Sequence, residues 1–182
     1  DASAAISPFV HVPEGDANQR EAMRLYDAHL QQYVDGLASA GSPYAFHTIG
    51  SLISVQARHY AMVRGIPKRA AGEDFYLLNK LAKVGRICAI DSAPIRVRGR
   101  LSDRVPFGTG AALLTMRESL ENGLPTRQYD PRVFDGLGHW LAALEHFVLH
   151  RNVESLKEQT RMLPAPLGPA LVETLEALGA FE

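Results

Sequence analysis

The sequence predicts an α/β fold in which a mixed sheet is flanked by helices and followed by a helical C-terminal tail. Two patterns predict it. Up to about residue 110, stretches with apolar residues at helical spacing alternate with short runs rich in β-branched residues, and the rest of the chain is patterned mainly as helix. The length of 182 residues, with 46% hydrophobic and 21% charged residues, is typical of a folded globular protein and argues against a mainly disordered chain.

The first predicted helix covers about residues 17–38. It follows a short apolar run at residues 4–12, which is interrupted by Pro8. Asp16 and Gln19 are three residues apart, which is typical of a capping box at a helix start. One apolar face then recurs at helical spacing and consists of Ala22, Tyr26, Leu30, Tyr33 and Leu37. The turn at residues 40–43 ends this helix, and residues 44–56 are expected to be extended.

The second predicted helix begins at residues 72–74 and ends before Gly85. Two acidic residues in its first turn complement the helix dipole. After it, residues 87–90 and 94–100 are expected to form two short strands. In the second strand, Ile95 and Val97 alternate with arginines, so that one face is apolar and the other is cationic.

The remainder, residues 111–182, is predicted to be mainly helical. Asp130 followed by a proline is typical of a helix start. The stripe that this helix would bury consists of Val133, Leu137, Leu141, Leu144 and Val148. Three prolines between residues 164 and 169 interrupt the chain before a last helix that carries Leu171, Leu175 and Leu178.

The net charge of −1 conceals an uneven distribution. Residues 58–104 contain eleven Lys or Arg against four Asp or Glu, a net charge of +7, and the rest of the chain carries −8. A block of this kind attracts phosphorylated or otherwise anionic ligands. The alternative is that these charges only solvate exposed faces.

Targeting signals and cysteine content point to a cytoplasmic protein. The sequence has no apolar run of the roughly 20 residues that a membrane-spanning helix needs, and no basic-then-apolar leader at its start. Cys88 is the single cysteine and therefore cannot form an internal disulfide, which favours a reducing compartment.

Residues 63–78 are the most informative stretch. They form a basic loop that leads into a helix whose first turn presents Glu73 and Asp74. A carboxylate at the mouth of a loop is able to take a proton from a substrate hydroxyl, and the cations Lys68 and Arg69 beside it are able to hold a phosphate leaving group. Acidic residues are, however, also common at helix starts for purely structural reasons.

The same stretch resembles a known family. The order of a small-residue segment at 48–51, an Arg-Gly-Ile-Pro loop at 64–67 and a Gly-Glu-Asp helix start at 72–74 resembles the acceptor-side half of family 2 glycosyltransferases, which have the GT-A fold. The resemblance covers about residues 1–110. It implies a GT-A-like mixed sheet and an inverting transfer of a sugar from a nucleotide-sugar donor to an acceptor hydroxyl.

The resemblance also implies roles for individual residues. Asp74 would be the general base that deprotonates the acceptor hydroxyl, and Glu73 would support the site or touch the acceptor. The remaining candidates for substrate binding are His47, Gly50, Ser51, Lys68, Arg69 and Arg104. For two of them another interpretation stays open, because His47 also fits a hydrogen-bonded core histidine and Arg104 also fits an ordinary surface residue in a glycine-rich turn.

A divalent cation, Mn²⁺ or Mg²⁺, is a further implication of the resemblance. Family members carry an Asp-x-Asp metal motif, to which residues 1–3 are similar except that Ser3 replaces the second carboxylate. Asp1 is the remaining candidate ligand, since hard cations prefer carboxylate oxygens. The resemblance further implies that an N-terminal nucleotide-binding half precedes this chain, which alone is not expected to catalyse transfer.

Other hypotheses stay open beside a soluble, non-processive transferase. The sequence lacks the Gln-x-x-Arg-Trp motif of processive synthases. The first alternative is a noncatalytic module that binds anions or nucleic acid through the basic segment 58–104, although few aromatic residues interleave its charges. The second hypothesis makes the helical tail after residue 129 a surface for homo-oligomer formation.

Overall fold

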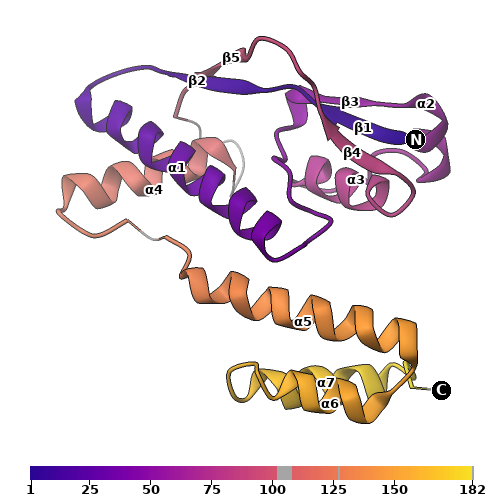
Figure 1. The fold of residues 1–182 in the computed structure, drawn as a ribbon. Helices are drawn as coiled ribbons and strands as arrows, with labels where there is room; N and C mark the ends of the chain where they lie inside the picture. Colours follow the sequence, from indigo (N-terminus) through magenta and orange to yellow (C-terminus); the bar gives the residue numbers. More distant parts are fainter. Residues whose placement is uncertain (102–107, 127, 182) are drawn as a thin grey trace. The chain divides into compact units, whose positions relative to one another are not determined.

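The computed structural model describes residues 1–101, 108–126 and 128–181. It has a mixed α/β fold, 53% helical, with small mixed sheets flanked by helices, as the sequence predicts. The chain divides into two compact units (Figure 1). The first comprises Asp1–Val34 and Phe46–Gln128, and the second comprises Asp35–Ala45 and Tyr129–Glu182. The first unit therefore continues beyond residue 110.

A three-stranded sheet forms the centre of the first unit. Strand β1 (Ala2–Ile6) lies in the middle, antiparallel to β3 (Ile53–Val55) and parallel to β4 (Arg86–Ala89). Ala5 is opposite Ser54 on one side and Cys88 on the other. The apolar run at the start of the chain thus supplies the central strand, which agrees with the near-continuous hydrophobic character of strands buried inside a sheet.

The first unit also contains a separate two-stranded sheet. In it, strand β2 (Phe9–Pro13) is parallel to β5 (Ile95–Gly99). Pro8 lies between β1 and β2 in the sequence. The Pro8 carbonyl accepts a hydrogen bond of 2.8 Å from the amide of Ile95. The alternation predicted for β5 is present only in part, because Val97 is half-buried while Ile95 remains 45% exposed.

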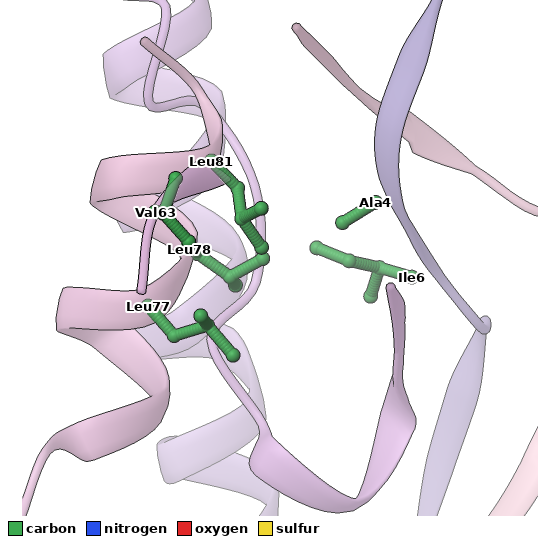
Figure 2. Close-up of a cluster of buried hydrophobic side chains, with 6 residues drawn as sticks. All are labelled: Ala4, Ile6, Val63, Leu77, Leu78 and Leu81. Atoms are coloured by element: carbon green, nitrogen blue, oxygen red, sulfur yellow. The ribbon is translucent and has the colours of Figure 1, made fainter. Parts of the chain in front are cut away.

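Helix α3 (Glu73–Leu81) packs on the three-stranded sheet. Its Leu77, Leu78 and Leu81 are buried and point towards Ala4 and Ile6 of β1 (Figure 2). Leu81 follows the other two by four and three residues, so the three side chains share one face of the helix. Phe75, which would share the face of Leu78 by its spacing, is instead 41% exposed. Because three leucines anchor this face, the first turn of α3 has a fixed position beyond the end of β1.

Helix α1 (Ala17–Ser39) and helix α4 (Thr109–Glu121) form the other apolar cluster of the first unit. The predicted capping box is confirmed in part, since the amide of Gln19 donates a 2.8 Å hydrogen bond to Asp16 Oδ1. Ala22, Met23 and Tyr26 of α1 are buried together with Leu113 of α4. The apolar stripe expected for residues 17–38 is therefore a packing surface.

The segment predicted to be extended at 44–56 is only partly so. Its last part contains a short 3₁₀ helix, η1 (Gly50–Leu52), followed by β3. Helix α2 (Ala57–Met62) comes next and was not predicted, because six residues are too few to display a helical apolar period. The carbonyl of Leu52 accepts a 3.0 Å hydrogen bond from Ser7, which ties η1 to the end of β1.

The second unit contains the last residues of α1 and three further helices in the part that the structure describes. Helix α5 (Pro131–His150) begins at the predicted residue, with the Asp130 carboxylate capping the amide of Arg132. Helices α6 (Val153–Thr160) and α7 (Leu167–Ala177) complete the unit. Its core consists of Ala143, Phe147 and Leu156, with Trp140, Val153, Leu175 and Phe181 packed around them. Within the described ranges of both units, no helix has the length and apolar character required to cross a membrane.

Candidate functional site

Gly72 turns the chain into α3 at the point where the two carboxylates appear. It adopts the left-handed conformation (φ 72°), which costs glycine little. Glu73 and Asp74 then occupy the first turn, where the partial positive charge of the helix dipole stabilises carboxylates. The leucine face of α3 holds this turn on the sheet, so the position of both carboxylates is set by the core.

The carboxylate of Asp74 lies between its own helix and η1. Its Oδ1 accepts a 2.7 Å hydrogen bond from the amide of Phe75. Its Oδ2 lies 3.2 Å from the position that a Cβ atom would occupy on Gly50. Because Gly50 has no side chain, it leaves room for this oxygen. The small-residue segment 48–51 and the Gly-Glu-Asp segment 72–74 are therefore neighbours in the fold.

A cleft of about 770 Å³ opens in front of Asp74 within the first unit. Three segments supply most of its wall: α1, residues 46–50 and residues 69–75. Its polar lining residues include Tyr26, His47, Thr48, Arg69, Glu73, Asp74 and Thr109. A hollow with a few convergent polar groups and a carboxylate on a rigid helix start has the form of a ligand-binding site.

Two hydroxyl groups form part of this cleft. The Tyr26 hydroxyl and Thr109 Oγ1 are 3.2 Å apart and share a hydrogen bond. Burial raises the pKa of the Tyr26 phenol, and the negative charges of Asp27 and Asp74 act in the same direction, whereas the hydrogen bond with Thr109 opposes them. Tyr26 therefore remains a neutral hydroxyl near Asp74 at physiological pH.

Arg69 is the cation of the cleft. Among the described residues that line it, no other Lys or Arg is present. The guanidinium of Arg69 lies 3.7 Å from the centre of the Tyr76 ring, an arrangement that orients the side chain through a cation–π contact. The loop before it is tied to α3, because Lys80 Nζ donates a 3.2 Å hydrogen bond to the carbonyl of Gly65.

His47 lies in the cleft wall, and its ring packs against the aromatic ring of Phe9. Its ring meets Phe9 edge-on at 5.2 Å, and the same phenylalanine meets His11 in the same way. His11 is buried and its Nδ1 lies 2.5 Å from Asp27 Oδ1. His47 thus packs against β2 and also lines the cleft, so both interpretations left open by the sequence fit its position.

The remaining candidates are distributed unevenly. Gly50 lines the cleft with Asp74, whereas Ser51 and Lys68 are exposed and do not belong to the lining as the described residues form it. Arg104 lies outside the described residues. Gly108 and Thr109, which follow that segment, line the cleft. The structure therefore brings together Glu73, Asp74, Gly50, His47 and Arg69 out of the predicted set.

Asp1 does not join this group. It precedes β1, and its carbonyl accepts a hydrogen bond from the amide of Arg86, beyond the C-terminal end of α3. Asp74 lies at the opposite end of that helix. Across the three stretches for which positions are given, no group of three or more His, Cys, Asp or Glu residues is arranged to hold a metal ion. Asp1 as a metal ligand remains a prediction from the resemblance.

A second, more apolar cavity of about 480 Å³ adjoins the cleft at the carboxylates. Gly50, Glu73 and Asp74 line both hollows, so they form the boundary between them. The remaining wall of the second cavity is made of Ile53, Val55, Ala57, Tyr60, Ile66 and Leu77. Asp74 is thus in contact with a polar compartment and an apolar one.

Sequence reasoning missed the hydroxyl pair and the apolar cavity. Tyr26 fits the apolar stripe of α1, and its spacing alone does not reveal that the hydroxyl reaches the cleft. The aromatic character of a residue that also carries a polar end is the one signal that was available. Ile66 belongs to the loop that carried the resemblance, but a lone exposed isoleucine has no distinguishing pattern.

Strand β5 and the residue after it carry a group of exposed arginines. Arg96, Arg98 and Arg100 alternate along this strand and the residue after it, and all three are exposed. Arg98 Nε lies 2.5 Å from Glu14 Oε1, which lowers the pKa of the Glu14 carboxyl through this hydrogen bond. One face of β5 thus carries most of the clustered positive charge.

Comparisons with known proteins add no relative. No protein-family model matches the chain, and neither a curated protein nor a solved structure matches it.

Proposed function

We propose that this chain is the acceptor-side part of a non-processive inverting glycosyltransferase of the family 2 type. In this proposal a sugar moves from a nucleotide-sugar donor to an acceptor hydroxyl, and Asp74 is the general base. The observation that supports it is the position of the Asp74 carboxylate, which lies on a core-anchored helix start, next to Gly50 and at the boundary of two hollows. A base needs a fixed position and access to its substrate.

The proposed reaction is a single displacement. Asp74 takes the proton of the acceptor hydroxyl, and the acceptor oxygen forms a bond to the anomeric carbon of the donor sugar. The bond between that carbon and the phosphate oxygen breaks on the opposite side, and its electron pair leaves with the nucleoside diphosphate. The configuration of the sugar is inverted because attack and departure occur on opposite faces.

The cleft residues have complementary roles in this proposal. Arg69 holds the negative charge that develops on the diphosphate, because a guanidinium matches phosphate oxygens in charge and geometry. The Tyr26 and Thr109 hydroxyls offer hydrogen bonds to a sugar. Glu73 borders both hollows and contacts the acceptor. No step is assigned to a divalent cation, because Asp1 does not line the cleft that the described residues form.

The test is nucleoside diphosphate release by the full-length gene product from a panel of nucleotide-sugars, with and without Mn²⁺. The proposal predicts release with at least one donor when acceptor is present, and its loss in Asp74→Asn. A protein that neither binds nor turns over any donor would contradict the proposal.

A second candidate function is a noncatalytic anion or nucleic-acid binding module. It is favoured by the arginine face of β5, formed by Arg96, Arg98 and Arg100. Binding of this type depends on released counterions and therefore falls steeply with salt. Replacing the three arginines by glutamine would abolish the binding of a single-stranded oligonucleotide, whereas Asp74→Asn would leave it unchanged.

A further inference from the structure

The second cavity differs in chemistry from the cleft that shares its boundary. Six of its lining residues have apolar or aromatic side chains: Ile53, Val55, Ala57, Tyr60, Ile66 and Leu77. Its ionisable residues are Glu73 and Asp74, at the boundary with the polar cleft, and the phenol of Tyr60. The wall of the second cavity therefore carries carboxylates at its boundary with the cleft and mainly apolar side chains elsewhere.

The wall of this cavity is held in place by hydrogen bonds. The amide of Ile66 donates a 3.3 Å hydrogen bond to the Tyr60 hydroxyl, which joins the loop to α2. Lys80 Nζ ties the Gly65 carbonyl to α3. Gly65 itself adopts a left-handed conformation (φ 68°) and packs against the Tyr60 ring, which leaves little room for a side chain. Ile66 thus has a defined position although it lies in a loop.

Two apolar side chains of the wall remain in contact with water. Ile66 is 51% exposed and Tyr60 is 40% exposed. Covering such surface with an apolar ligand group is favourable, because apolar area is then removed from water. An anionic group would not be favoured here, because no Lys or Arg is among the described residues of the lining and two carboxylates border it.

We propose that this cavity binds an apolar, uncharged part of the acceptor, next to the hydroxyl that receives the sugar. The inference rests on the proposed function and specifies its substrate class. With an apolar group seated against Ile66 and Leu77, a hydroxyl attached to that group lies at the boundary formed by Gly50, Glu73 and Asp74. The donor would then occupy the polar cleft, and the two substrates would meet at Asp74.

Binding of a small probe tests the cavity without requiring catalysis. Benzyl alcohol carries a hydroxyl on an apolar ring, and glycerol carries hydroxyls without an apolar part. We expect benzyl alcohol, added to the full chain with ¹³C-labelled isoleucine and leucine methyl groups, to shift the signals of Ile53, Ile66 and Leu77. Glycerol should leave these signals unchanged at equal concentration.

Two matched variants assign the binding to the cavity. Ile66→Ser removes an exposed apolar side chain of the wall, and Met62→Ser removes one that is 55% exposed and outside the wall. We expect Ile66→Ser to weaken benzyl alcohol binding about tenfold, because the ring then buries less apolar surface, and Met62→Ser to have no effect. Equal binding by both variants, or equal shifts with glycerol, would overturn the inference.

The outcomes also separate this inference from the proposed function. Benzyl alcohol binding at these methyl groups, together with a full-length gene product that neither binds nor turns over a nucleotide-sugar, would support the apolar site and contradict the transferase proposal. A protein that transfers sugar through Asp74 but does not bind benzyl alcohol would support the transferase and contradict the apolar acceptor site.

Discussion

Gly50 and Asp74 lie against each other although they belong to separate segments of the chain. A Cβ on Gly50 would be 3.2 Å from Asp74 Oδ2 and 3.4 Å from Asp74 Cβ. Contacts this short are rare for real side chains, so any larger residue at position 50 would press on the carboxylate. The pair explains why a small residue is required in η1, and it makes the geometry of the proposed base depend on a residue outside α3.

Replacing Gly50 by alanine should therefore lower activity without unfolding the protein. Gly50 does not adopt a left-handed conformation, so alanine is compatible with its backbone. The added methyl group would displace the Asp74 carboxylate by a few tenths of an ångström, and since a misplacement of about 1 Å costs up to about 10²-fold in rate, a smaller loss follows from this shift. We expect kcat for sugar transfer by the full-length gene product to fall about tenfold, as measured by nucleoside diphosphate release.

The matched control for this variant is Gly136→Ala. Gly136 lies in α5, and a Cβ there would meet only Leu163 Cδ2, at an ordinary contact distance of 4.0 Å. It should leave transfer unchanged and stabilise the helix by about 0.5–1 kcal/mol, because glycine in a helix is less favourable than alanine. If Gly50→Ala were as active as Gly136→Ala, Gly50 would not define the position of Asp74.

The ring of Tyr76 should contribute to donor binding through Arg69. Tyr76 does not line the cleft that the described residues form, but its ring orients the guanidinium that does. A cation–π contact at an exposed site contributes about 0.5–1 kcal/mol, which corresponds to a change in affinity of about two- to fivefold. Tyr76→Leu should raise the donor KM by this factor and leave kcat unchanged. Tyr76→Phe keeps the ring and should behave as the unsubstituted protein, so an equal effect of both variants would exclude this role.

The start of α5 should be sensitive to low pH. Hydrogen bonds from the Arg132 side chain and backbone lower the pKa of Asp130 to about 2. Since the pKa of an aspartate in an unfolded chain is about 3.9, this contact stabilises the helix start fully above that pH. Its contribution is lost as the pH falls through about 2. A carboxyl ¹³C titration of Asp130 should give this midpoint, and Arg132→Ala should move it upwards. A midpoint that Arg132→Ala leaves in place would show that Arg132 is not the cause.

The predicted helices and strands are confirmed where local signals are strong. Helix α1 (Ala17–Ser39) matches the prediction at 17–38, and β4 (Arg86–Ala89) and β5 (Ile95–Gly99) match the runs at 87–90 and 94–100. Capping residues specify such elements without help from the rest of the chain. Asp130 is an example, because its carboxylate caps α5 at the residue where the sequence places the helix start. The stripe predicted to be buried in α5 is wrong in part, because Val133 is 57% and Val148 is 64% exposed, whereas Phe134, Ala143 and Phe147 are buried.

Other parts of the fold depend on interactions between residues that are distant in the sequence. The pairing of β1 with both β3 and β4 joins segments that no local pattern connects. Of the candidates predicted from the sequence, Asp74, Gly50 and Arg69 line one cleft. Tyr26 enters that cleft only because α1 packs with α4 and its hydroxyl meets Thr109. Such relationships arise from tertiary packing and are not encoded by spacing.

The transfer rate of Asp74→Asn compared with its donor affinity tests the central claim most directly. Asparagine keeps the shape of the side chain but cannot accept the acceptor proton, and loss of a general base reduces the rate about 10²- to 10⁴-fold. The matched control is Asp91→Asn, the same change at an exposed residue that does not line the cleft of the described chain. We predict that Asp74→Asn loses transfer by this factor while donor affinity is retained, and that Asp91→Asn is unaffected. Transfer by Asp74→Asn at the unsubstituted rate would contradict the role of Asp74 as the base.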